Sequence, residues 1–106
     1  MVSIDNFRKI CMTFPAVTEQ PHFEKTSFRV NKKIFATLAE EQKTAVIKLS
    51  EKEQSVFCAF DPAVLYPVPN KWGKQGWTMI NLKAVKTAML KDALTISYNE
   101  VSSTKK

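Results

Sequence analysis

The chain has 106 residues, of which 44% are apolar and 25% charged, as expected for one globular domain. Its apolar runs are too short to span a bilayer and its first residues lack the order of a signal peptide, so we expect a cytoplasmic protein without a membrane partner. Fourteen lysines and two arginines against ten acids give a net charge of +6, which favours anionic partners such as nucleic acid, acidic protein or anionic lipid.

The first elements are a helix and a series of strands. Helical spacing of apolar residues predicts a helix over residues 4–13, with Ser3 as its N-cap, that ends before Pro15. A short strand or turn is expected at residues 21–24. Alternating patterns predict strands at residues 26–30, 33–38 and 44–49. The short turns between them, Asn31-Lys32 and residues 40–43, predict antiparallel neighbours.

The second half contains two further helical regions and one strand. Ser50 and Glu53 form a capping box, which predicts a helix over residues 51–59, and Asp61-Pro62 opens a short helical turn. Residues 66–76 are predicted to be a loop, and residues 77–82 a strand. A last helical region is expected from about residue 81 to Val101, either as one helix or as two broken near residues 91–92. Residues 102–106 are expected to fray.

This order of elements predicts a single α+β domain over residues 1–106, with a mostly antiparallel sheet and helices packed on one face. The other sheet face is expected to be partly solvated, with Arg29, Lys33 and Lys48 pointing outward. The predicted core is Phe7, Ile10, Phe28, Val30, Phe35, Leu38, Val46, Ile47, Phe57, Trp77, Ile80, Leu90 and Leu94.

Residues 71–77 concentrate unusual side chains in a basic segment. Both tryptophans and both glycines of the protein fall within six residues, inside a stretch, 62–91, that has five lysines and no acid. Exposed tryptophan is costly without a partner, and paired glycines indicate a backbone with unusual angles. The segment therefore suggests a surface that meets an anionic partner.

Groups for catalysis or metal binding are present but do not form a motif. The candidate side chains are Cys11, Glu19, His22, Glu24, Cys58, Ser97 and Tyr98. A lone histidine without a second ligand at metal spacing predicts no metal site, and the two cysteines are expected to be buried and reduced. We expect Ser97-Tyr98 to pack the last helix on the sheet. The sequence predicts a non-catalytic domain without a cofactor.

Several segments in this order resemble the MmcQ/YjbR-like proteins, a family of small bacterial α+β domains. The resemblance covers nearly the whole chain. The segments that carry it are Phe14-Pro15 followed by Glu19, the strand pair from Ser27 to Leu38, Val46 to Leu49, Gly76-Trp77 with Ile80 and Leu82, and Ser97-Tyr98 followed by Val101. The resemblance implies a CyaY/frataxin-like fold of the type called double wing, and DNA binding. It brings no catalytic residues.

The residues and the resemblance together lead to two hypotheses. In the first, the chain is a monomer that binds DNA or RNA weakly, in a salt-sensitive and sequence-indifferent way, through two basic loops. The candidate residues are Arg29, Lys32, Lys33, Lys71, Trp72 and Lys74. Replacing Lys71 and Lys74 by glutamate should then abolish binding. In the second, residues 66–77 form a surface for a protein or small ligand.

Overall fold

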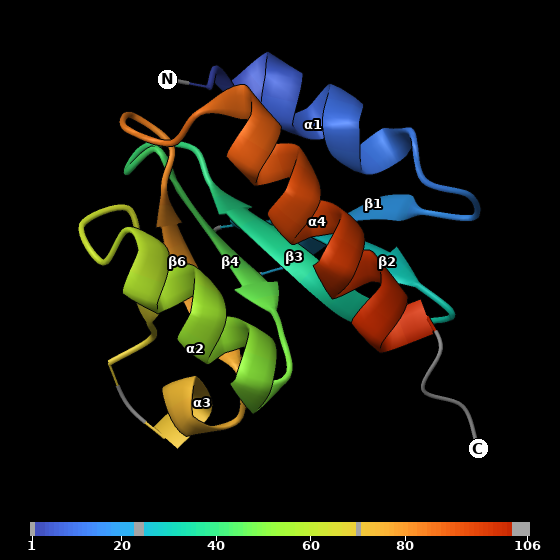
Figure 1. The fold of residues 1–106 in the computed structure, drawn as a ribbon. Helices are drawn as coiled ribbons and strands as arrows, with labels where there is room; N and C mark the ends of the chain where they lie inside the picture. Colours follow the sequence, from blue (N-terminus) through green and yellow to red (C-terminus); the bar gives the residue numbers. More distant parts are fainter. Residues whose placement is uncertain (1, 23–24, 70, 103–106) are drawn as a thin grey trace.

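A computed structural model describes residues 2–22, 25–69 and 71–102 and contains one six-stranded sheet (Figure 1). The strands follow the order β1-β2-β3-β4-β6-β5, and every neighbouring pair is antiparallel. Their bounds are β1 Thr18–His22, β2 Lys25–Val30, β3 Lys33–Ala39, β4 Thr44–Lys48, β5 Leu65–Pro67 and β6 Trp77–Asn81. In the described part of the chain, no helix is long and apolar enough to cross a membrane.

Three helices cover the same face of this sheet: α1 Ile4–Met12, α2 Glu51–Phe60 and α4 Thr87–Ser102 (Figure 1). A short helix, α3 Lys71–Lys74, precedes β6. The predicted caps are present, because the Ser3 and Ser50 hydroxyls accept the Asn6 and Glu53 amides at 3.1 and 3.2 Å. The antiparallel sheet and the helices on one of its faces together confirm the predicted α+β fold.

The core lies between the helices and the covered sheet face, and it includes most of the predicted residues. The fully buried ones are Phe7, Phe28, Val30, Phe35, Leu38, Ile47, Ile80, Leu90 and Leu94. Ile10 and Phe57 are partly buried against this core. Val46 and Trp77 were wrongly placed in it: both are half-buried and line a hollow on the uncovered face. Strand alternation is the reason, since neighbours such as Val46 and Ile47 point to opposite faces.

A β-bulge in β3 changes the register of the sheet. Phe28 pairs with Ala36 while Arg29 pairs with Ile34, so Phe35 is the extra residue, and both Phe35 and Ala36 are fully buried. Ser97 of α4 bonds two backbone groups near the bulge. Its hydroxyl donates to the Phe35 carbonyl at 2.8 Å and accepts from the Lys48 amide at 3.1 Å.

Several predicted bounds differ from the structure. The first strand is longer than expected and begins at Thr18, and the predicted loop at residues 66–76 contains most of β5 and all of α3. The short turn predicted at Asp61-Pro62 is present, because residues 62–64 form a turn and the Leu65 amide donates to the Asp61 carbonyl at 3.0 Å. The last helix starts at Thr87 rather than near residue 81, and it is unbroken at residues 91–92. Of the predicted frayed tail, Ser102 ends α4 and residues 103–106 lie outside the described residues.

Candidate functional site

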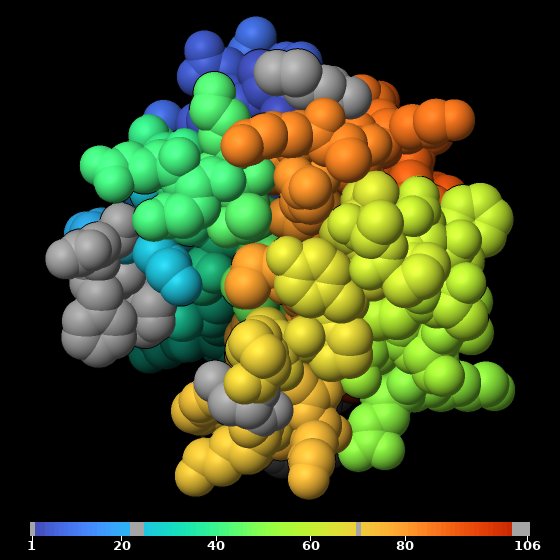
Figure 2. Space-filling view, turned by 90° about the vertical axis from the view of Figure 1, so that its left-hand side faces the viewer, coloured from blue at the N-terminus to red at the C-terminus, as the bar shows by residue number. Residues whose placement is uncertain are grey.

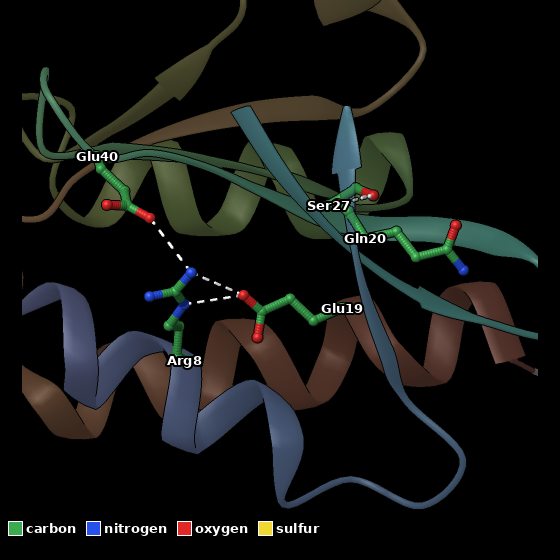
Figure 3. Close-up of polar contacts among 5 residues, drawn as sticks. All are labelled: Arg8, Glu19, Gln20, Ser27 and Glu40. Atoms are coloured by element: carbon green, nitrogen blue, oxygen red, sulfur yellow. Dashed lines mark hydrogen bonds and ion pairs between the residues drawn. The ribbon is translucent and has the colours of Figure 1, made fainter. Parts of the chain in front are cut away.

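The hairpin between β2 and β3 presents its basic residues in fixed positions. Asn31 and Lys32 form the turn, and both have left-handed backbones, with φ of 53° and 66°. Arg29 Nε donates to the Ser27 hydroxyl at 3.1 Å. That hydroxyl in turn donates to the Gln20 carbonyl of β1 at 3.0 Å (Figure 3). The Arg29 side chain is thus tied to the sheet and not free to swing with the turn.

Four cations line one hollow of about 490 Å³, which we call the basic hollow. They are Arg29, Lys32, Lys33 and Lys48, and Glu100 is the one acid in the lining. Ile34, Trp77 and Val101 also line it. Because Glu100 and Val101 belong to α4, the basic hollow lies at the end of the sheet, between the β2-β3 hairpin and the end of α4. A concave surface with an excess of positive charge attracts anions, because it concentrates the electrostatic field of its cations.

A second hollow of about 480 Å³ adjoins the basic hollow, because both are lined by Ile34 and Trp77. We call it the apolar hollow. Its other apolar lining residues are Val46, Val68 and Trp72, and Lys25 and Thr37 supply the polar part of its lining. Figure 2 shows a recess between the cyan start of β2 and the gold segment that contains α3. The apolar hollow is therefore formed by the uncovered sheet face on one side and the segment around Trp72 on the other.

Both glycines are required for the close packing of the segment around α3. A Cβ atom on Gly73 would lie 2.1 Å from the Val68 carbonyl oxygen, and one on Gly76 would lie 1.8 Å from the Leu49 carbonyl oxygen. Gly76 also has φ of +104°, which other residues rarely adopt. The predicted unusual angle thus applies to Gly76, whereas Gly73 is required because the backbone of Val68 lies where a Cβ atom would be.

Two polar side chains also hold this segment to the rest of the fold. Lys48 Nζ donates to the Gln75 carbonyl at 2.8 Å. Gln54 Nε2 of α2 lies within hydrogen-bond distance of the Gly73 carbonyl at 2.9 Å, the Trp77 carbonyl at 3.1 Å and the Thr78 hydroxyl at 3.2 Å. The position of Trp72 therefore depends on the sheet and on α2.

The structure brings some of the predicted binding residues together and separates others. Arg29, Lys32 and Lys33 share the basic hollow, and Trp72 lies in the adjoining one. Lys74 instead lines a hollow beside α2, together with Gln54 and Cys58. Lys71 is exposed and lines neither the basic nor the apolar hollow.

Sequence reasoning placed Trp77 in the core and did not include it among the nucleic-acid-binding residues, although it ends the segment 66–77 considered as a ligand surface. The signal was present in the strand parity, because residues 77 and 80 are an odd number apart and cannot face the same side of one strand. Since Ile80 is in the core, Trp77 had to face the other side. The outward direction of Lys48 was expected, but its contact with the Gln75 carbonyl depends on a loop whose path the sequence does not reveal.

Three of the seven candidate catalytic side chains, those of Glu19, Ser97 and Tyr98, have structural partners. Arg8 Nε donates to Glu19 Oε2 at 2.9 Å, and an Arg8 Nη nitrogen lies 3.4 Å from Glu40, so these residues connect α1, β1 and the end of β3 (Figure 3). The Tyr98 hydroxyl donates to the Pro15 carbonyl at 2.6 Å, and its ring stacks on Phe14. With Ser97 bonded to the sheet, the predicted packing role of Ser97-Tyr98 is confirmed.

The remaining candidates do not form a reactive group in the described residues. Cys11 is fully buried, and burial, with a smaller contribution from the Glu19 charge, raises the pKa of its thiol far above the ordinary value. Cys58 is only half-buried, which corrects the expectation that both thiols are in the core, and burial raises its pKa too. Glu24 and the side chain of His22 lie outside the described residues. Within those residues, no three potential metal ligands lie together.

Comparisons with known proteins identify the family and the fold. Residues 12–100 match the family model described as YjbR. The crystal structure of Deinococcus radiodurans protein DR2400, described as a DUF419 domain, superposes with a TM-score of 0.85 at 21% identity, over 97% of this chain and 80% of that chain. At this identity the likeness shows the fold alone. No curated protein matches the sequence.

Proposed function

The chain belongs to the YjbR family, and we propose that this member binds nucleic acid through the basic hollow and the uncovered sheet face beside it. The observation that carries the proposal is the gathering of Arg29, Lys32, Lys33 and Lys48 in one hollow beside Trp77. Phosphate oxygens are attracted to such a cluster irrespective of base sequence. Because the two hollows adjoin at Ile34 and Trp77, one single strand can contact both the cations and the aromatic side chains.

The composition of the site favours weak and sequence-indifferent binding. Lysine outnumbers arginine fourteen to two in the chain, and lysine lacks the planar fork that pairs with guanine or phosphate in a fixed geometry. Of the four cations in the basic hollow, Lys48 also donates to a backbone carbonyl. We therefore expect the affinity to come mostly from released counterions, and to fall steeply as salt is raised.

The test is fluorescence anisotropy with labelled duplex DNA, single-stranded DNA and RNA between about 50 and 200 mM salt, with heparin as a competing polyanion. The variant Arg29→Gln with Lys33→Gln removes two charges from the basic hollow. The matched control, Lys52→Gln with Lys91→Gln, removes two exposed charges from α2 and α4. For a single strand, we expect the first pair to reduce the slope of log affinity against log salt by about 1.4 and the control to leave it nearly unchanged.

Several outcomes contradict the proposal. If both pairs weaken binding equally, the positive charge acts generically and the uncovered face has no special role. If heparin displaces every nucleic acid at trace concentration, the chain binds any polyanion.

A third pair of substitutions, Lys71→Glu with Lys74→Glu, tests the predicted contribution of α3. Unchanged affinity would confine the site to the hairpin and the sheet.

The apolar hollow supports a second candidate function, the binding of a small flat ligand or a peptide. Its volume of about 480 Å³ falls inside the range of roughly 300–1,000 Å³ that is usual for ligand pockets. Trp72 and Trp77, the two tryptophans of the chain, both line it, so ligand binding should change the intrinsic fluorescence. A ligand that changes the fluorescence of the wild type but not of Trp72→Ala, while nucleic acid leaves both unchanged, would favour this function.

A further inference from the structure

We propose that the apolar hollow is a subsite for one unpaired base, whose phosphate lies in the adjoining basic hollow. The inference rests on the proposed function and specifies its ligand as single-stranded nucleic acid. It follows from the way the two hollows are joined. Ile34 and Trp77 line both of them, so a ligand can pass from the cations to the aromatic side chains without leaving the surface.

The chemistry of the lining matches the chemistry of a nucleotide. A base has two apolar π-faces and a polar edge, and the apolar hollow provides two indole rings and three aliphatic side chains, with Lys25 and Thr37 as its polar lining residues. A nucleotide also has a phosphate, and the basic hollow provides four cations. A purely apolar ligand would gain nothing from these cations, so the pair of hollows favours an occupant with both an aromatic and an anionic part.

The shape of the site favours a single strand over a duplex. The bases of a duplex are stacked and paired, so their faces are inaccessible to a recessed indole. A duplex can therefore use only the basic hollow, whereas a single strand can use both. Trp72 is 50% exposed, so an arriving base can reach the indole without unfolding of the segment around α3.

The test compares a normal oligonucleotide with one of equal length whose sugars carry no bases. The two have the same phosphates, and they differ only in what can occupy the apolar hollow. We expect the abasic strand to bind about tenfold more weakly than the normal strand, as the loss of one stacked base predicts. Trp72→Ala should lower the affinity for the normal strand to that for the abasic strand, and it should leave the affinity for the abasic strand unchanged. Trp72→Phe should restore much of the difference in affinity between the two strands.

The variant Trp72→Phe also leaves Trp77 as the one fluorescent indole, because the chain has two tryptophans. A stacked base should quench the Trp77 fluorescence, and the abasic strand should not.

Equal binding of normal and abasic strands would overturn the subsite and leave the proposed function intact, whereas no binding of either strand in about 50 mM salt would overturn both. If Trp72→Ala weakens both strands equally, Trp72 acts on the fold and not on a base. If a mononucleotide binds as tightly as the strand, the ligand is a free nucleotide.

Discussion

At the scale of single residues, the lysine at position 32 occupies a backbone conformation that suits glycine. Its φ of 66° follows a φ of 53° at Asn31, which is the pattern of a tight hairpin turn for which Asn-Gly is the preferred sequence. A side chain in this region costs about 1–2 kcal/mol. The chain thus keeps a cation at the tip of the hairpin although glycine would fit the turn better.

The variant Lys32→Gly should therefore raise the free energy of unfolding by up to about 1 kcal/mol, while it weakens nucleic-acid binding. The loss of one phosphate contact should lower the salt slope for a single strand by about 0.7. Urea denaturation and anisotropy measure the two effects. As a control, Lys33→Gly lies in β3 and should destabilise the protein. A drop in stability for Lys32→Gly would show that the turn is not strained.

Burial of Cys11 makes the stability of the protein depend on pH in the alkaline range. Below about pH 8.5 the thiol is protonated in both the folded and the unfolded chain, so it has no effect. Above that pH the unfolded chain loses the proton, whereas the folded chain keeps it because burial raises the pKa of the Cys11 thiol. The free energy of unfolding should then fall with rising pH, by up to about 1.4 kcal/mol per unit from this group.

Denaturation at several pH values measures this effect, with Cys11→Ala as the comparison. The variant is expected to be less stable at neutral pH because it leaves a small cavity, but to lose less stability between about pH 8.5 and 10. A chromogenic thiol reagent should react with the half-buried Cys58 before Cys11. Parallel pH curves for the wild type and the variant would contradict the assignment.

At the scale of elements, α4 is attached to the sheet by polar bonds as well as by apolar packing. The bulge at Phe35 disturbs the ladder between β2 and β3, and the Ser97 hydroxyl bonds the Phe35 carbonyl and the Lys48 amide. The next residue, Tyr98, reaches the carbonyl of Pro15 in the loop after α1. The residues Ser97 and Tyr98, on which part of the family resemblance depends, thus join three separate segments.

Replacing Ser97 by alanine should lower the free energy of unfolding by about 1–3 kcal/mol, because the buried Phe35 carbonyl and the partly buried Lys48 amide lose a partner. Thermal or urea denaturation measures the loss. Ser55→Ala, on the exposed side of α2, is the matched control and should change stability by less than about 0.5 kcal/mol. Equal effects of the two substitutions would show that the bond to the bulge contributes nothing specific.

At the scale of the whole molecule, the helices divide the surface into two regions with different roles. One sheet face is covered by α1, α2 and α4 and forms the core, so the other face must be stable while it contacts solvent (Figure 1). That face contains the apolar hollow, and the basic hollow lies at its end, between the hairpin at Asn31-Lys32 and the end of α4. With a net charge of +6, the whole molecule also attracts anionic partners over a distance of about one Debye length.

The sequence by itself determined the longer elements and their type, because these depend on contacts between residues close along the chain, whereas β5 and α3 fell in a predicted loop. The caps at Ser3 and Ser50, the turn at Asn31 and the alternation of β2 and β3 could all be recognised from local patterns. The same reasoning identified Arg29, Lys32, Lys33 and Trp72 as candidates, since charge and aromatic content are visible without a fold.

Only the tertiary structure decided which of these candidates lie together. The bulge at Phe35, the joining of the two hollows at Trp77 and the separation of Lys74 from the basic hollow depend on how strands pair across the sheet. The same is true of the contacts of Gln54 and Lys48 that hold the segment around α3. Such pairings join residues far apart in the chain, and no local pattern specifies them, because their energy arises only when the whole sheet and its core have formed.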